Sequence, residues 1–129
     1  AVLKVSPLGG IDTTRSLAIK AHNAGMEVVI SSALESSVGL SWGVRSAALL
    51  HDEFGGLADA GLGTAAFFTG DTTTKPLEIS NGTVSVSEPV LDYSSLQQHA
   101  ASSERIKWWH ERLERCLPLV VTLLRAHEN

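Results

Sequence analysis

The most constraining feature of the chain is a short apolar run that ends in polar side chains and is followed by a helical pattern. Residues 26–30 are predicted to form a buried strand, and residues 31–37 then bring several serine hydroxyls and the Glu35 carboxylate together. Residues 38–50 have the apolar spacing of a helix. Parallel α/β proteins build binding sites where such strands end. This stretch therefore predicts an α/β fold with a candidate site after the strand.

Strand and helix patterns also precede and follow this stretch. Residues 1–5 are predicted to be a strand, followed by a helix that Asp12 or Thr13 caps and that ends near Gly25. Residues 60–68 are predicted to be a third short strand, or a strand end that runs into a turn of helix. Repeated strand–helix units indicate a parallel sheet or barrel, with both helices on one outer face.

The character of the chain changes after residue 70. Asn81-Gly82 lies between two short alternating segments, which predicts a tight hairpin. A last helix is predicted to begin at Ser102 or Ser103, and Pro118 is expected to kink or stop it.

Composition excludes several classes of function. The net charge is −4 and there is no block of Lys and Arg, so we expect no nucleic-acid partner. The longest apolar run, residues 117–124, is far below the roughly 20 residues that a membrane span requires, so we expect no membrane partner. The single cysteine, Cys116, excludes an intramolecular disulfide and fits a cytoplasmic location. Because Ala1 begins inside an apolar run, we expect further residues upstream of it.

Lys4 is the first candidate for chemistry. A lysine within an apolar strand is costly unless its ammonium group reaches a pocket or solvent. It could act as an acid or base, or stabilise a developing anion, at the end of the strand. The alternative is a lysine whose side chain extends into solvent at the edge of a sheet.

The polar residues after the second strand are the next candidates. Alternation along the strand directs Ser31 and Ser32 to opposite sides, so one of them could bind a substrate carboxylate. The alternative is that both hydroxyls satisfy loop backbone or cap the following helix. Glu35 could be a general base, but a structural role on backbone amides is favoured.

Glycines at the third strand are a weaker signal. Gly61, Gly63 and Thr64 could bring backbone N–H groups to an anion, or could simply form a tight turn. They match neither a dinucleotide fingerprint nor a P-loop, the histidines lack metal-ligand spacing, and no nucleophile elbow is present.

Three segments together carry a family resemblance. They are VLKVSPLGG (residues 2–10), VISSALESSVGL (residues 29–40) and GLGT (residues 61–64). Their order and separation resemble the sixth, seventh and eighth strands of the o-succinylbenzoate synthases, which belong to the enolase superfamily. The resemblance covers roughly residues 1–90.

The resemblance implies a fold and a division into segments. It implies that residues 1–70 are the C-terminal part of a modified TIM barrel, strands six to eight. Residues 71–96 would then be a segment that returns to the capping domain, and residues 97–129 a C-terminal helical extension.

The resemblance also implies an activity, which is the syn-dehydration of a succinyl-hydroxy-cyclohexadiene carboxylate in menaquinone biosynthesis. Lys4 would stabilise the enediolate, while Ser31, Ser32 and the backbone of Gly61 and Leu62 would contact the carboxylate substrate. The family holds this intermediate with Mg²⁺, but its acidic ligands have no counterpart here and are expected upstream. The chain is therefore expected to need the rest of the barrel, or a partner chain, and to be inactive alone.

Two other functions remain open. One is a related enzyme of the superfamily, similar to the N-succinylamino acid racemases, with Lys4 as an acid or base. The other is a non-catalytic fragment or association module that uses the apolar tail, residues 108–124.

Overall fold

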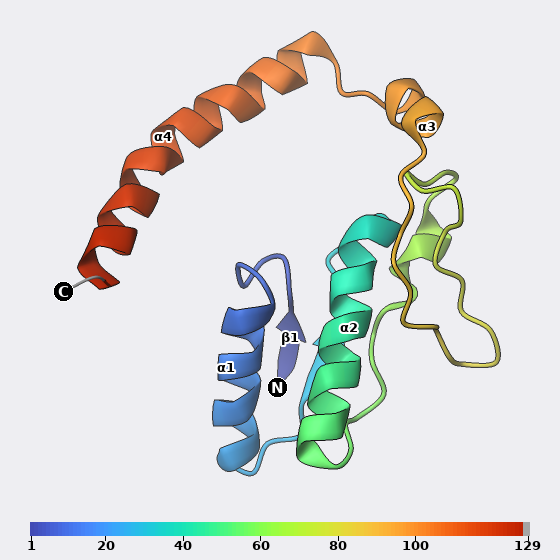
Figure 1. Cartoon of the computed structure of the whole chain (residues 1–129), viewed down its shortest axis with the longest axis vertical. Coiled ribbons are helices and arrows are strands. Elements are labelled where there is room, and N and C mark those ends of the chain that lie inside the picture. The colour runs from blue at the N-terminus through green and yellow to red at the C-terminus, as the bar shows by residue number, and fades with distance from the viewer. Residues whose placement is uncertain (128–129) are drawn as a thin grey trace. The chain divides into compact units, whose positions relative to one another are not determined.

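The computed structural model describes residues 1–127, and it describes the side chains of residues 1–120. The chain forms two compact units, Ala1–Gln98 and His99–Asn129. The first unit contains β1 (Val2–Lys4), α1 (Ile11–Asn23), β2 (Val29–Ser31), α2 (Ser37–Phe54), the 3₁₀ helix η1 (Gly63–Phe67) and α3 (Tyr93–Gln98). The second contains α4 (Ser103–His127), and Figure 1 shows these elements.

A small parallel sheet confirms the α/β class. β1 pairs with β2 in parallel, with Val2 opposite Val29, Leu3 opposite Ile30 and Lys4 opposite Ser31. The predicted third strand is only a single parallel bridge, in which Ser31 pairs with Gly61. η1 begins directly after this bridge, so the alternative of a strand end that runs into helix is the one observed. The strands of a barrel are not seen among the described residues.

Both helices pack on the same side of this sheet, as the crossover rule predicts. α1 and α2 lie side by side (Figure 1), and their buried residues join those of the strands in one core. The buried residues of this core are Ala18, Val28, Ile30, Leu40, Val44, Leu50 and Leu62. On the strands, Ile30 is completely buried while Val2 is 65% exposed, which shows that the other face of the sheet is uncovered.

The ends of α1 correct one prediction and confirm another. The helix begins at Ile11, with Gly10 at its N-cap and no side-chain cap, so the caps predicted at Asp12 and Thr13 are wrong. Gly10 has φ 121°, and this turn leads the chain into the helix before either side chain can act as a cap. At the other end Gly25 has φ 76°, and the amides of Gly25 and Met26 bond to His22 and Ala21. These bonds form the predicted glycine C-cap.

α2 continues beyond the predicted end at residue 50, to Phe54 and a left-handed Gly55 with φ 69°. The added turn is polar but has tertiary support, because Glu53 forms a two-bond ion pair with Arg15 of α1 at 2.6 and 2.8 Å. His22 also stacks on Phe54 with ring centroids 4.2 Å apart. These contacts depend on the packing of two helices, so the periodicity of α2 alone does not reveal them.

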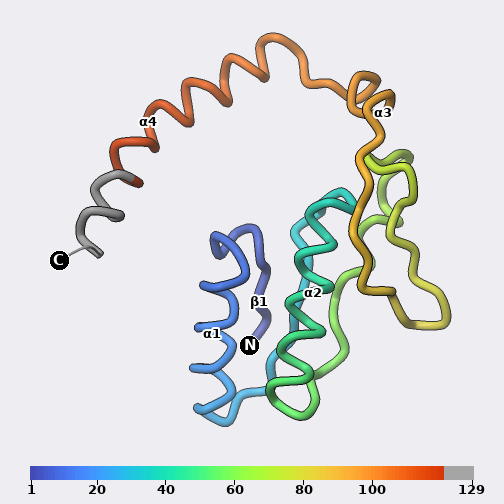
Figure 2. Tube along the Cα trace, in the orientation of Figure 1, coloured from blue at the N-terminus to red at the C-terminus, as the bar shows by residue number. Residues whose placement is uncertain are grey.

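The segment between η1 and α3 returns past the N-terminal end of α2 (Figure 2). Ser80 and Thr83 exchange two backbone hydrogen bonds of 2.9 Å around Asn81 and Gly82, which both have positive φ. This confirms the predicted tight turn, although the flanking segments are not strands. The assignment of residues 71–96 to a capping domain stays a prediction.

A carboxylate starts α3. Asp92 accepts hydrogen bonds from the backbone and hydroxyls of Ser94 and Ser95. The hydroxyl bonds, with Ser94 first, lower the pKa of Asp92 below its usual value. A lowered pKa means that the cap is present at neutral pH and is lost only as the pH falls through that value.

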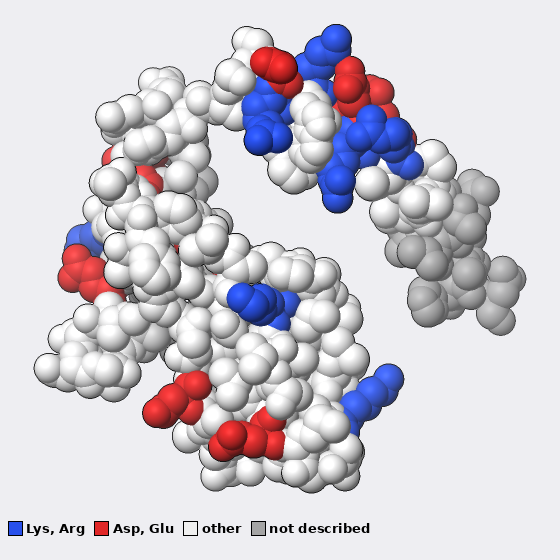
Figure 3. Space-filling view, turned by 180° about the vertical axis from the view of Figure 1, so that it is seen from behind, with Lys and Arg blue, Asp and Glu red and all other residues white. Residues whose placement is uncertain are grey.

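The second unit is a single long helix. Ser102 caps α4 by accepting from the amide of Arg105 at 3.2 Å, as predicted. The helix continues through Pro118, so of the two predicted outcomes, a kink or a stop, the stop is not observed. A proline perturbs one turn of a helix without always ending it. Charged side chains gather on its N-terminal part (Figure 3). No helix among residues 1–127 combines the length and hydropathy that a membrane crossing requires.

We expect the 129-residue chain to self-associate in solution. Its sheet has an uncovered face on which Val2 is 65% exposed, and no described strand pairs with the outer edge of β1. Apolar faces and free edges of this kind promote association. Light scattering coupled to size exclusion should show oligomers or aggregates. A monodisperse monomer with a sharp, reversible unfolding transition would contradict this expectation.

Candidate functional site

Three sequence-predicted site residues lie in one row across the sheet. Lys4 pairs with Ser31, and Ser31 pairs with Gly61. The Gly61 amide donates to the Ile30 carbonyl at 2.8 Å. Because paired residues of neighbouring strands face the same side, Lys4 and Ser31 project from the uncovered face, opposite the helices. We call Lys4, Ser31 and Gly61 the site row.

Lys4 is exposed, as the solvent-directed alternative requires, but its amine is also held at the sheet. Nζ donates a 2.5 Å hydrogen bond to the backbone carbonyl of Ser32. No carboxylate among the described residues pairs with it. A cation held at the carboxyl end of a strand, without a neutralising partner, can stabilise negative charge on a ligand.

The two serines have different surroundings. Ser31 lies on the open face, and its hydroxyl makes only a long bond of 3.3 Å to the Gly61 carbonyl. Ser32 is 2% exposed, and its hydroxyl contacts the Gly61 carbonyl at 3.2 Å and the Thr64 hydroxyl at 2.8 Å. Ser31 is therefore free to turn to a ligand, while Ser32 ties the Gly61 segment to β2.

Leu62 also lies on the covered side. Its side chain is 7% exposed and packs in the core, where a Cβ added to Gly43 of α2 would come within 2.8 Å of it. The close approach of α2 to Leu62 therefore depends on Gly43. The substrate-binding roles of Ser32 and of the Gly61 and Leu62 backbone stay predictions.

Glu35 has the structural role that the sequence favours. One carboxylate oxygen accepts from the Ser6 hydroxyl, and the other accepts from the Ala33 amide at 3.2 Å. The carboxylate thus connects the turn after β1 with the turn after β2. Between Ala33 and Glu35, Leu34 has a left-handed backbone with φ 60°.

Asp71 is an important residue that sequence reasoning missed. Its carboxylate accepts from the amide of Ser37 at 3.1 and 3.2 Å and from the Ser37 hydroxyl at 2.5 Å, at the start of α2. A carboxylate is stabilised at a helix N-terminus by the free backbone N–H groups and the positive end of the helix dipole. The two residues are 34 positions apart, so no local capping pattern could have found this contact.

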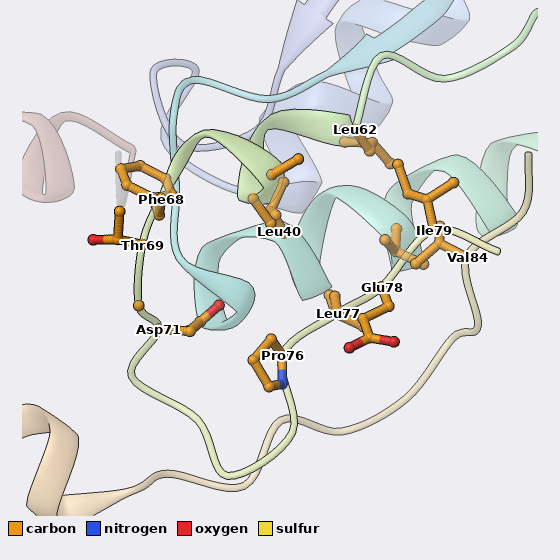
Figure 4. Close-up of a pocket in the computed structure, with 15 residues that line it drawn as sticks. Leu40, Leu62, Phe68, Thr69, Asp71, Pro76, Leu77, Glu78, Ile79 and Val84 are labelled. Carbon is orange, nitrogen blue, oxygen red and sulfur yellow. The ribbon is translucent and has the colours of Figure 1, made fainter.

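A cavity with a volume of about 440 Å³ lies on the helix side of the sheet. Leu40 and Val44 of α2, η1 and the returning segment line it, together with Leu62 (Figure 4). Its lining is mainly apolar and includes none of the site row. The cavity and the row are therefore separate features.

The described residues do not fit a magnesium site. No group of three or more His, Cys, Asp and Glu side chains among residues 1–127 is placed to hold a metal ion. Of the carboxylates near the strand ends, Glu35 is bonded to the loops and Asp71 to α2. The part of the chain that the structure describes therefore supplies no metal ligand set.

Comparison with known proteins agrees with the three sequence motifs. No family model matches the chain. It is 38% identical over 122 residues to the o-succinylbenzoate synthase of Mycobacterium tuberculosis. This match covers 94% of this chain and 35% of that protein. The o-succinylbenzoate synthases of Mycobacterium marinum and Mycobacterium ulcerans are each 36% identical over 121 residues, with 35% of their length covered.

The chain is a homologue of the o-succinylbenzoate synthases. This confirms the resemblance that the motifs predict. The chain spans about a third of the length of these curated relatives, which fits a C-terminal portion. Because the first unit ends at Gln98, a match of 122 residues includes at least 24 residues of the second unit. The matched residues therefore extend into α4, beyond the residues 1–90 that the motifs covered.

The two serines offer a test of the site geometry. Ser32→Ala should destabilise the fold by about 1–2 kcal/mol, because the Thr64 hydroxyl and the Gly61 carbonyl lose the hydrogen bonds that the buried Ser32 hydroxyl makes with them. Ser31→Ala, the matched control, should change stability by less than about 0.5 kcal/mol. Thermal unfolding by circular dichroism at matched protein concentration measures both. Equal effects of the two substitutions would contradict the assigned orientations.

Proposed function

We propose that this chain supplies one wall of the active site of an o-succinylbenzoate synthase, a carbon–oxygen lyase of menaquinone biosynthesis in the cytoplasm. The observation that supports this most strongly is the site row, in which Lys4 and Ser31 pair at the ends of two parallel strands and Gly61 joins them through a parallel bridge. In the proposed complete enzyme these residues lie on barrel strands six, seven and eight. The similarity to relatives that carry this name supports the same activity.

Lys4 is the proposed catalytic residue. Removal of the proton α to the substrate carboxylate places negative charge on that carboxylate as an enediolate. A fixed ammonium group lowers the energy of this state more than that of the substrate, so it accelerates the reaction. The bond from Lys4 Nζ to the Ser32 carbonyl holds the cation at the strand ends before substrate arrives.

Ser31 and Gly61 are proposed to orient the substrate. The long bond between the Ser31 hydroxyl and the Gly61 carbonyl is easily exchanged for a bond to a carboxylate oxygen. Gly61 has no side chain, and a Cβ there would lie 3.1 Å from the Ser31 hydroxyl oxygen. The glycine therefore leaves the Ser31 hydroxyl accessible. Ser32 then acts from the covered side by fixing the Gly61 segment.

The proposal requires groups that this chain does not supply. We assign to the other part of the barrel both the second lysine, which removes the proton in the family, and the residues that would hold Mg²⁺. A bound Mg²⁺ would there supply further stabilisation of negative charge. The chain alone is therefore proposed to be inactive, and the open face of its sheet is the surface that the other strands complete.

A chimera tests this proposal. In it this chain replaces the homologous third of the Mycobacterium tuberculosis enzyme, and formation of o-succinylbenzoate is followed by absorbance. We expect a folded, active chimera in which Lys4→Ala lowers kcat by about 10²- to 10³-fold, the scale of losing one electrostatic stabiliser. Mg²⁺ binding should persist, because Lys4 is not a ligand.

Lys20→Ala is the matched control, since Lys20 is exposed on α1, away from the site row. It should leave kcat unchanged. A folded chimera that binds Mg²⁺ but forms no product, or an unchanged kcat in Lys4→Ala, would contradict the proposed function.

A further inference from the structure

Glu35 occupies an unusual position between the two loops that follow the site strands. The turn after β1 begins directly after Lys4 and is closed by backbone hydrogen bonds, including one from the Leu8 amide to the Lys4 carbonyl at 3.2 Å. Ser6 lies in this turn and donates to Glu35. Ala33 lies two residues beyond Ser31 and donates to the other oxygen of the same carboxylate. One side chain therefore connects the backbone segments that carry Lys4 and Ser31.

The aliphatic part of the Glu35 side chain, its stem, packs closely against α2. A Cβ built on Gly39, in the first turn of α2, would lie only 2.6 Å from the Glu35 Cβ and 3.0 Å from its Cγ. Glycine at position 39 thus allows the stem to lie against the helix. With the carboxylate bonded on both sides and the stem packed, Glu35 has little freedom to move toward a substrate as an acid or base.

The residue between Ala33 and Glu35 has a strained backbone. Leu34 has φ 60°, a conformation that costs energy for any residue with a side chain and persists only where its surroundings hold it. Its side chain is 62% exposed, so burial does not hold it there. The bond from the Ala33 amide to Glu35 closes this turn, and it is the contact that offsets the strain.

We propose that Glu35 is a positioning residue that holds the strained Leu34 turn and, through Ser6, fixes the spacing between Lys4 and Ser31. This inference rests on the proposed function, because the spacing matters only where the site row faces a substrate. It assigns Glu35 no proton transfer. Loss of the contact lets the Leu34 turn relax, which moves the Ser32 carbonyl that anchors Lys4.

Substitutions at position 35 separate this role from acid–base catalysis. In Glu35→Gln the amide oxygen accepts from Ala33 and the amide nitrogen donates to the Ser6 hydroxyl, so both contacts persist. Glu35→Ala removes both. In the active chimera we expect Glu35→Ala to lower kcat about 10- to 100-fold, the scale of a small misplacement of reacting groups, and Glu35→Gln to lower it less than about threefold. Equal losses in the two variants would overturn the proposal in favour of a general base.

A second substitution tests the strain directly. Glycine adopts a positive φ without steric cost, so Leu34→Gly in the Glu35→Ala background should restore most of the lost kcat. Failure of this double variant to recover activity would overturn the assigned link to Leu34. Glu88→Gln is the control for a charge removed elsewhere, since Glu88 is exposed in the returning segment, and it should leave kcat unchanged.

Amide hydrogen exchange on the 129-residue chain provides a measurement that does not depend on activity. We expect Glu35→Ala to accelerate exchange at Ala33 and in residues 8–10, and Glu35→Gln and Glu88→Gln to have little effect. If the unsubstituted chimera forms no product, the proposed function fails, and exchange alone then decides whether Glu35 holds the two loops. Unchanged exchange in Glu35→Ala would overturn the positioning role.

Discussion

The backbone pairing of β1, β2 and the Gly61 bridge is the constraint on which the site depends. The parallel register fixes Lys4 opposite Ser31 and Ser31 opposite Gly61, and the amide of Gly61 bonds to Ile30 at 2.8 Å. A shift of one residue between the strands would turn either Lys4 toward the helices or Ile30 toward the open face. Burial of Ile30 in the core therefore sets the register and, with it, which polar groups face away from the helices.

The rest of the first unit maintains this arrangement from the covered side. Ser32 and Thr64 hold the Gly61 segment, Gly43 lets α2 approach Leu62, and Asp71 holds the start of α2 from the returning segment. The large apolar cavity lies on this side as well, away from the site row. One face of the sheet therefore packs against the helices, and the other is the face that we propose to bind substrate.

Local patterns in the sequence predict the elements, the parallel class and the site row. The β-branched strand, the polar loop and the helical spacing are all contained in residues 26–50, and the family motifs identify Lys4, Ser31 and Gly61. What the sequence does not predict depends on distant contacts. Asp71 reaches Ser37 across 34 residues, and Arg15 supports the last turn of α2 through Glu53. Gly10 starts α1 ahead of the expected caps because the turn before it already has a left-handed backbone.

The central claim is that the open face of the sheet, and not the apolar cavity, receives the substrate. A crystal structure of the chimera soaked with o-succinylbenzoate tests this most directly. We expect the ligand over the site row, with Lys4 Nζ facing its ring or carboxylate and the Ser31 hydroxyl within hydrogen-bond distance of a carboxylate oxygen. Ligand found only in the cavity between α2 and η1, or bound on the open face with Lys4 turned away from it, would contradict this account.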